Sequence, residues 1–205
     1  LLDHVQLDGD LNALIDVLEE LLFLVLYFDI GQERLFKLYQ RYNVLIKERH
    51  KGSGIFTGNV LEKASKIRVG YLSGDFRNHV MGKMMYPAIS RHNHAKFEIH
   101  CYSLTGQEDD WTRKFREASH KFVSLSGMDE LQAAKLIARD NLDILVDLST
   151  HTKGARPAIL AFKPARVQIT HVASAGAVGL DTIDFKLTDH FADTPENQEY
   201  LIETL

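Results

Sequence analysis

The sequence is poor in the residues and segments that define several large classes of protein. It has one cysteine, Cys101, among 205 residues, so no disulfide framework or cysteine-based zinc site can form within the chain. Its 24 lysines and arginines stand against 28 acidic residues, which leaves no basic excess for general binding to nucleic-acid phosphates. The most apolar stretch, residues 17–27, contains two glutamates and is shorter than the roughly 20 residues of a membrane span. These absences favour a globular protein of a reducing compartment, and we expect a cytoplasmic location.

Sequence motifs for metals and common cofactors are also absent. The chain has no HExxH pair and no acidic calcium loop. Its glycines do not have the spacing of a dinucleotide fingerprint or a Walker loop. We therefore expect no metal site and no cofactor.

Two helices are predicted in residues 1–50. Asp10 is placed to cap the first, in which apolar residues recur every three or four positions from 11 to 25, and Gly31 lies at the break before the second. Such a pair is an αα-hairpin, the unit of helical repeats, although it is equally consistent with a helical cap on the next domain. The glycine-containing residues 51–65 are the predicted linker.

Strands and helices alternate from residue 66 to residue 205, which we take as one domain. Predicted strands occupy residues 67–72, 97–104, 121–125, 143–148, 166–171 and 185–188. Predicted helices occupy residues 80–92, 109–119, 130–140, 157–162 and 195–205. This alternation indicates an α/β fold with a doubly wound, mostly parallel, Rossmann-like sheet.

Three histidines follow predicted strands and are therefore expected at one edge of the sheet. His79 follows the first strand, His151 follows the strand at 143–148, and His171 ends the strand at 166–171. Ligands of such folds bind outside the carboxyl ends of the strands. An imidazole titrates near neutrality and can relay a proton from a hydroxyl nucleophile, which is the role we assign to His79. The alternative is that His79 only caps the helix that follows.

Two loops at the same edge carry further candidate substrate-binding residues. Thr152, Lys153, Gly154 and Arg156 follow His151, and the two basic side chains are suited to hold a phosphate or carboxylate. The small-residue loop at 173–179 includes Gly176 and Gly179, where a ligand could approach backbone N–H groups closely. Asp75 and Asp147 either orient the imidazoles or cap strand ends.

Several ordered segments together resemble the SPINDLY/O-GlcNAc transferase family, and the resemblance is to a bacterial member. They are KIRVGYLSGDFRNHVMG, KFEIHCYSL, LDILVDLSTHTKGARPAILAFKPARVQIT and DTIDFKLTD. The resemblance extends from about residue 35 to the end of the chain.

The resemblance implies the N-terminal half of a GT-B glycosyltransferase, preceded by tetratricopeptide-type helices. Members transfer N-acetylglucosamine from UDP-GlcNAc to serine or threonine of proteins, with inversion and without a metal. The family's histidine after the first strand matches His79, and its HT-x-G-x-R turn matches His151, Thr152, Gly154 and Arg156. Most nucleotide contacts would come from a C-terminal half outside this sequence, so we expect the chain alone to be inactive.

The chain departs from the family pattern in one loop. The family usually has a tryptophan and a Gly-Tyr-Pro-Gly-Thr loop where this chain has HVASAGAVG, residues 171–179. The change leaves two alternatives open: a transferase of the same fold with another UDP-sugar or acceptor, and a non-catalytic helical-repeat interaction module.

Overall fold

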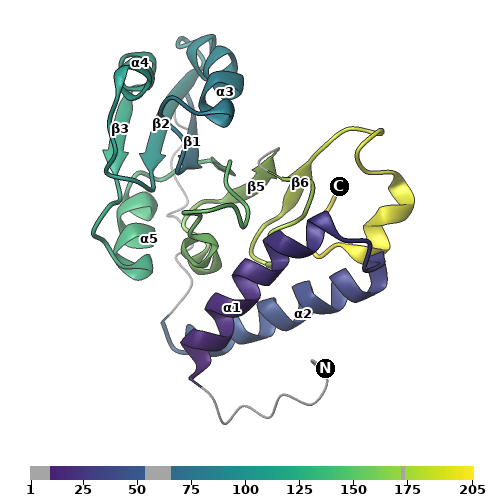
Figure 1. Cartoon of the computed structure of the whole chain (residues 1–205). Coiled ribbons are helices and arrows are strands. Elements are labelled where there is room, and N and C mark those ends of the chain that lie inside the picture. The colour runs from purple at the N-terminus through teal and green to yellow at the C-terminus, as the bar shows by residue number, and fades with distance from the viewer. Residues whose placement is uncertain (1–9, 54–65, 172–173) are drawn as a thin grey trace.

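The computed structural model describes residues 10–53, 66–171 and 174–205. The chain begins there with two helices that lie side by side, α1 (Leu11–Leu24) and α2 (Gln32–Arg49), joined through the short 3₁₀ turn η2 (Val25–Tyr27) (Figure 1). Asp10 caps α1 as expected, because its carboxylate accepts a hydrogen bond from the backbone N–H of Asn12 at 3.0 Å. Most of the predicted linker, residues 54–65, lies outside the described residues.

The described residues form one parallel sheet in the order β3-β2-β1-β4-β5-β6. Its strands are β1 (Ile67–Ser73), β2 (Phe97–Ser103), β3 (Lys121–Ser124), β4 (Ile144–Asp147), β5 (Val167–His171) and β6 (Phe185–Leu187). This is the order of a doubly wound nucleotide-binding sheet. Strands are added on one side of β1 up to β3 and then on the other side from β4 onward, so the strand order reverses between β1 and β4. The predicted α/β fold class is confirmed.

Helices cover both faces of the sheet. They are α3 (Val80–Ser90), α4 (Asp110–Ala118), α5 (Glu130–Arg139), and the 3₁₀ helices η3 (Pro157–Phe162) and η4 (Pro195–Tyr200). Side chains alternate across β1: Val69 and Tyr71 pack in the cluster that contains residues of α3 and α4, and Leu72 packs in the cluster that contains residues of α5. The sheet therefore has a separate apolar core on each face.

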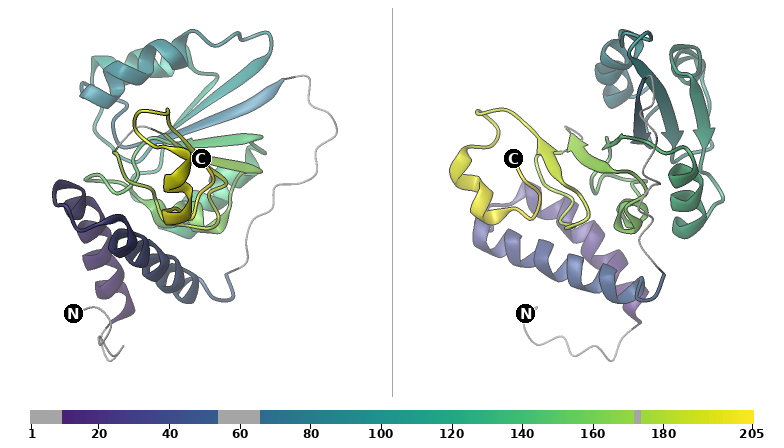
Figure 2. Two further views of the ribbon diagram at one scale, coloured as in Figure 1. Left: turned by 90° about the vertical axis from the view of Figure 1, so that its right-hand side faces the viewer. Right: turned by 180° about the vertical axis from the view of Figure 1, so that it is seen from behind.

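The helical hairpin shares the second of these cores. Ile15 of α1 and Tyr42 of α2 belong to the same buried cluster as Val178 and Ile159. Both views in Figure 2 place α1 and α2 against the later part of the chain and away from α3. The hairpin therefore packs against η3, η4 and the loops beside the β4–β6 half of the sheet.

The predicted helix at residues 195–205 is wrong beyond Tyr200. Only η4 is helical, and Thr204 instead forms a parallel bridge with Phe185 at the start of β6. The side-chain amide of Gln198 fixes this end, because it donates to the carbonyl oxygen of Glu203 and accepts from the N–H of Leu205.

Candidate functional site

The loops that follow β1 and β4 meet at the point where the strand order reverses. The backbone N–H of Gly74 donates to Oγ of Ser149 at 3.3 Å. A Cβ atom on Gly74 would lie 3.7 Å from the carbonyl oxygen of Gly154. We call the contact between residues 74–79 and 149–156 the β1–β4 seam. Ligands of doubly wound sheets bind at such a position.

His79 both caps α3 and presents a ring to solvent at the seam. Its Nδ1 accepts from the N–H of Met81 at 3.3 Å and lies 3.2 Å from Oδ2 of Asp75. The neutral ring can accept from Met81 through Nδ1, whereas a ring protonated at Nδ1 pairs with Asp75. The side chain is 43% exposed, and in the described part of the chain Nε2 has no hydrogen-bond partner. Nε2 can accept a proton only in the tautomer that carries its proton on Nδ1, where it pairs with Asp75 in place of the cap.

Asp75 and Asp147 have the two different roles that the sequence left open. Asp75 is buried and lies between His79 and Arg77, whose guanidinium donates to Oδ1 at 3.1 Å. Asp147 caps the end of β4, where it accepts from the backbone N–H groups of Ser149 and Thr150 at 3.1 and 2.8 Å. Burial raises the pKa of Asp147 to about 6. Asp75 is thus the aspartate that orients an imidazole.

His151 lies in the core beneath the seam. It is 8% exposed, and its Nε2 donates to the carbonyl oxygen of Val178 at 2.7 Å. The ring packs edge-on against Tyr42 of α2, with centroids 5.0 Å apart. Burial lowers the pKa of His151 to about 4, so the ring stays neutral near pH 7. Its Nδ1 is buried without a partner among the described residues.

The remaining residues of the 151–156 turn are of two kinds: some are exposed to solvent, and others bond to the backbone of the fold. Lys153 and Gly154 are exposed, and the hydroxyl of Thr152 donates to the carbonyl oxygen of Ser149 at 2.7 Å. The guanidinium of Arg156 donates to the carbonyl oxygens of Leu125 and Met128 at 3.2 and 2.6 Å. Lys153 is therefore the more accessible of the two predicted phosphate-binding cations, and the substrate role of Arg156 stays a prediction.

Gly176 and Gly179 lie under Tyr39 of α2. A Cβ atom on Gly176 would come within 2.8 Å of the Tyr39 hydroxyl oxygen, and one on Gly179 within 2.6 Å of its ring. The same hydroxyl accepts from the N–H of Ala177 at 3.0 Å. These glycines allow the close approach of a helix, and their predicted role in substrate binding stays untested.

A buried carboxylate holds the other side of this loop. Oε1 of Glu203 accepts from the backbone N–H groups of Val178 and Gly179 at 3.0 and 2.7 Å. Burial raises the pKa of Glu203. His171, at the start of the same loop, is tied to the carbonyl oxygen of Leu187 through Nδ1 at 3.1 Å. Sequence reasoning missed Glu203 because the residue fell in a predicted helix with no special pattern.

The rim at the carboxyl ends of the strands thus has two parts. The part at residues 74–79 and 152–154 is open to solvent in places, and it includes the His79 ring. The part at His151, Gly176 and Gly179 is buried against the hairpin. In the described residues, no group of three or more metal-ligating side chains could hold a metal ion, and no helix could span a membrane.

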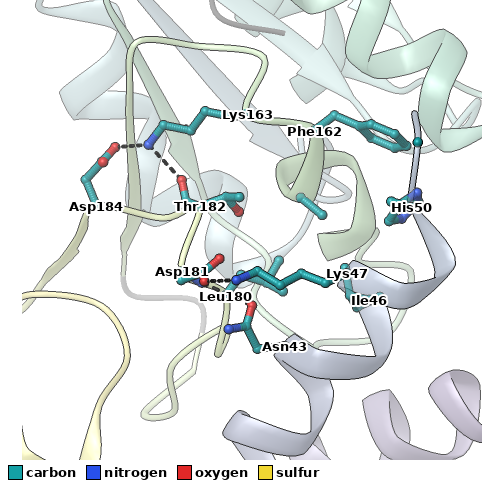
Figure 3. A pocket seen from close by; sticks show the side chains of 12 residues that line it. Asn43, Ile46, Lys47, His50, Phe162, Lys163, Leu180, Asp181, Thr182 and Asp184 are labelled. Carbon is teal, nitrogen blue, oxygen red and sulfur yellow. Dashed lines mark hydrogen bonds and ion pairs between the residues drawn. The ribbon is translucent and has the colours of Figure 1, made fainter. Parts of the chain in front are cut away.

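A cavity of about 610 Å³ lies at the amino ends of β5 and β6, on the edge of the sheet opposite the rim (Figure 3). Its lysines are both paired, Lys47 with Asp181 and Lys163 with Asp184. Lys163 also donates to the carbonyl oxygen of Thr182 at 2.8 Å. This cavity lies away from the seam. Lys47 joins α2, and Lys163 joins the end of η3, to the segment that leads into β6.

Comparison with known proteins gives one consistent result. Residues 39–205 match the profile of the family described as "Glycosyl transferase family 41". Two similar proteins of Arabidopsis thaliana are the probable UDP-N-acetylglucosamine–peptide N-acetylglucosaminyltransferases SEC and SPINDLY. SEC is 34% identical over 62% of this chain and 13% of its own length, and SPINDLY is 30% identical over 72% and 16%.

A solved structure of a mutant Thermobaculum terrenum O-GlcNAc transferase is also similar. It superimposes with a TM-score of 0.83 at 26% identity, over 93% of this chain and 37% of that chain. The chain therefore spans about a sixth or less of the length of these two curated relatives and little more than a third of the solved one.

Proposed function

Because the chain belongs to glycosyl transferase family 41, we propose that it forms part of an inverting, metal-independent enzyme that transfers N-acetylglucosamine from UDP-GlcNAc to serine or threonine of proteins. The relatives named above are UDP-GlcNAc–peptide transferases. The likeness to the solved O-GlcNAc transferase confirms the α/β fold class, and we propose that the chain is the N-terminal half of a GT-B fold. The observation that carries the proposal is the position of His79, with an accessible ring, beside the reversal of strand order.

The proposed reaction is a single displacement. The acceptor hydroxyl forms a bond to the anomeric carbon while the bond from that carbon to the diphosphate oxygen breaks and UDP leaves. In the tautomer that carries its proton on Nδ1 and donates it to Asp75, His79 takes up the hydroxyl proton at Nε2, directly or through water. Asp75, 3.2 Å from Nδ1, stabilises the imidazolium that results. Positioning the hydroxyl supplies a further large part of the rate enhancement, up to about 7–11 kcal/mol in favourable cases.

The rest of the site is proposed to come from elsewhere in the protein. Lys153 and Gly154 are exposed at the seam and are the residues of this chain best placed to contact the substrates. The C-terminal half of the enzyme would provide most contacts to UDP. We further propose that α1 and α2 end a tetratricopeptide array and that the enzyme acts in the cytoplasm on protein acceptors.

Replacing His79 by asparagine in the full-length protein tests the proposal. Asparagine is a good helix N-cap, so His79→Asn keeps the start of α3 but removes the proton acceptor. We expect kcat to fall about 10²- to 10⁴-fold with little change in the KM for UDP-GlcNAc. Sugar transfer to a protein acceptor, followed by mass spectrometry, measures the change.

His94→Asn is the matched control, because His94 is exposed and lies before β2, at the edge of the sheet opposite the rim. Its turnover should equal that of the wild type. Near-normal turnover of His79→Asn with a natural acceptor would remove His79 from the mechanism.

The altered sequence at residues 171–179 favours a second candidate, a transferase of the same fold that uses another UDP-sugar. Incubating one acceptor protein with several UDP-sugars distinguishes the two by the mass added. Calorimetry with UDP separates both from a non-catalytic module, which would not bind the nucleotide.

A further inference from the structure

The loop that carries His79 is short, and its backbone decides where the ring lies. Residues 74–79 connect β1 to α3, and the N–H of His79 donates to the carbonyl oxygen of Arg77 at 2.7 Å. A general base must be placed accurately, since a displacement of about 1 Å can lower a rate about 100-fold. The residues that fix this backbone are therefore part of what makes His79 effective.

Asp109, the residue before α4, binds the backbone of this loop directly. Its Oδ2 accepts from the N–H of Asn78 at 2.7 Å. Its Oδ1 accepts at the same time from the N–H groups of Trp111 and Thr112, at 2.8 and 3.0 Å. One carboxylate therefore joins the start of α4 to the residue next to His79.

The loop also packs closely on both neighbouring helices (Figure 1). Phe76 is buried against Phe115 of α4, with ring centroids 4.9 Å apart. A Cβ atom on Gly82 of α3 would come within 2.5 Å of the carbonyl oxygen of Arg77 and 2.6 Å of that of Asp75. Because α4 is held to the loop by packing as well, Asp109 is a fixed anchor for Asn78.

The carboxylate of Asp109 stays ionised where an imidazole titrates. The hydrogen bond from the N–H of Asn78 lowers the pKa of Asp109 from its ordinary value, and the bonds from α4 lower it further. Hydrogen bonds to an ionised acceptor are stronger than those between neutral groups. The link to Asn78 is therefore present throughout the pH range in which His79 is proposed to act.

Asp129 shows what an aspartate cap does without this link. Asp109 and Asp129 both begin a helix with a capping box, Asp109 at α4 and Asp129 at α5. Among the described residues, the carboxylate of Asp129 accepts only from the N–H of Gln132, in its own helix. The bond to a second loop is thus an addition to the capping role of Asp109.

From these contacts we propose that Asp109 is a positioning residue: by holding the backbone of Asn78, it keeps the ring of His79 where Nδ1 lies 3.2 Å from Oδ2 of Asp75. Asp109 acts through His79 and not on the substrates. The consequence for turnover rests on the proposed function, in which the same ring takes up the proton of the acceptor hydroxyl.

Replacing Asp109 by asparagine in the full-length protein separates the two roles of the carboxylate. The amide keeps one oxygen, which can accept from α4, but its NH₂ group cannot accept from the N–H of Asn78. We expect kcat to fall about tenfold or more, with little change in the KM for UDP-GlcNAc. Mass spectrometry of a protein acceptor measures the sugar transferred.

Asp129→Asn is the matched control, because it makes the same substitution at a cap that lacks the link. Its kcat should equal that of the wild type. Thermal unfolding should give similar midpoints for Asp109→Asn and Asp129→Asn, which shows that loss of turnover in one of them is not loss of the fold.

Nuclear magnetic resonance tests the position of the ring without relying on turnover. In protein labelled with ¹³C at histidine Cε1, the signal of His79 is identified by its absence in His79→Asn. We expect this signal to move in Asp109→Asn and to stay in place in Asp129→Asn. The double variant His79→Asn/Asp109→Asn should have the kcat of His79→Asn alone, because residues that act as a unit are not additive.

The outcomes separate the positioning role from the proposed function. An unmoved His79 signal in Asp109→Asn overturns the positioning role. So does a wild-type kcat of Asp109→Asn in a protein whose turnover depends on His79, or a further loss of kcat in the double variant. A moved signal together with near-normal turnover of His79→Asn supports the positioning of the ring and contradicts the proposed function of His79 alone.

Discussion

At the scale of single residues, two buried titratable groups lie four positions apart, Asp147 at the end of β4 and His151 in the turn that follows. Burial favours the neutral form of each: it raises the pKa of Asp147 to about 6 and lowers the pKa of His151 to about 4. For Asp147 the folded chain binds more protons than the unfolded chain between about pH 4 and pH 6. For His151 the unfolded chain binds more protons between about pH 4 and pH 6.5. The two residues therefore affect stability in opposite directions as the pH changes.

Comparing the wild type with a variant of either residue should reveal how that residue's own titration changes stability. His151 contributes a free energy of unfolding that is complete above pH 6.5 and is lost as the pH falls toward 4. The difference between wild type and His151→Gln should therefore grow by about 3 kcal/mol from pH 4 to 6.5. The difference between wild type and Asp147→Asn should shrink by about 3 kcal/mol from pH 4 to 6. Urea unfolding at a series of pH values measures both.

Each variant serves as the control for the other, because other carboxylates contribute equally to both comparisons. Differences that do not change with pH would show that neither group titrates abnormally in the folded chain.

At the scale of elements, the sequence predicted what local pattern determines. The apolar run at 143–148 predicted a buried parallel strand, and β4 (Ile144–Asp147) is central in the sheet. Asp10 was predicted to cap the first helix, and its carboxylate accepts from the N–H of Asn12 at 3.0 Å. Such features depend on neighbours in sequence, so a single sequence contains them.

The sequence could not predict features that depend on distant partners. Residues 201–205 have a helical composition, but they are not helical in the structure. The carboxylate of Glu203 instead accepts hydrogen bonds from the N–H groups of Val178 and Gly179. Likewise, nothing near His151 in sequence shows that Tyr42 covers it. The sequence therefore predicted that the candidate site lies at the rim. It did not predict which residues of the site face solvent.

The contact between α2 and the loop at 174–180 gives a prediction that separates packing from backbone strain. Gly179 and Gly31 both have φ of +79°, but a Cβ on Gly179 would lie 2.6 Å from the Tyr39 ring whereas Gly31 has open space around it. Gly31→Ala should cost about 1 kcal/mol, from backbone strain alone. Gly179→Ala should cost about 3 kcal/mol, because overpacking adds to that strain. Urea unfolding compares them, and equal costs would show that Tyr39 moves aside freely.

At the scale of the whole molecule, the hairpin and the sheet form one folding unit in the described residues. Tyr39 and Tyr42 are fully covered, and both belong to the cluster that contains Ala177 and Leu180. Lys47 adds an ion pair with Asp181 at the surface. The helices therefore contribute to the core of the α/β domain and do not only precede it.

Deleting the hairpin should consequently destabilise the sheet. A chain of residues 66–205 would expose the apolar side chains that face α2. We therefore expect it to unfold at a lower urea concentration and to bind more of a hydrophobic dye than the complete chain does. Circular dichroism and dye fluorescence measure these changes. An unchanged midpoint would mean that the sheet folds independently of the helices.

The burial of part of the rim has a practical consequence for altering what the proposed transferase recognises. Mutant libraries aimed at Gly176, Gly179 or His151 would mostly sample misfolded proteins. Tyr39 occupies the space that a side chain at either glycine would need, and Tyr42 packs on the ring of His151. Randomising Lys153 instead varies an exposed side chain. Screening for new donors or acceptors should begin at that surface position.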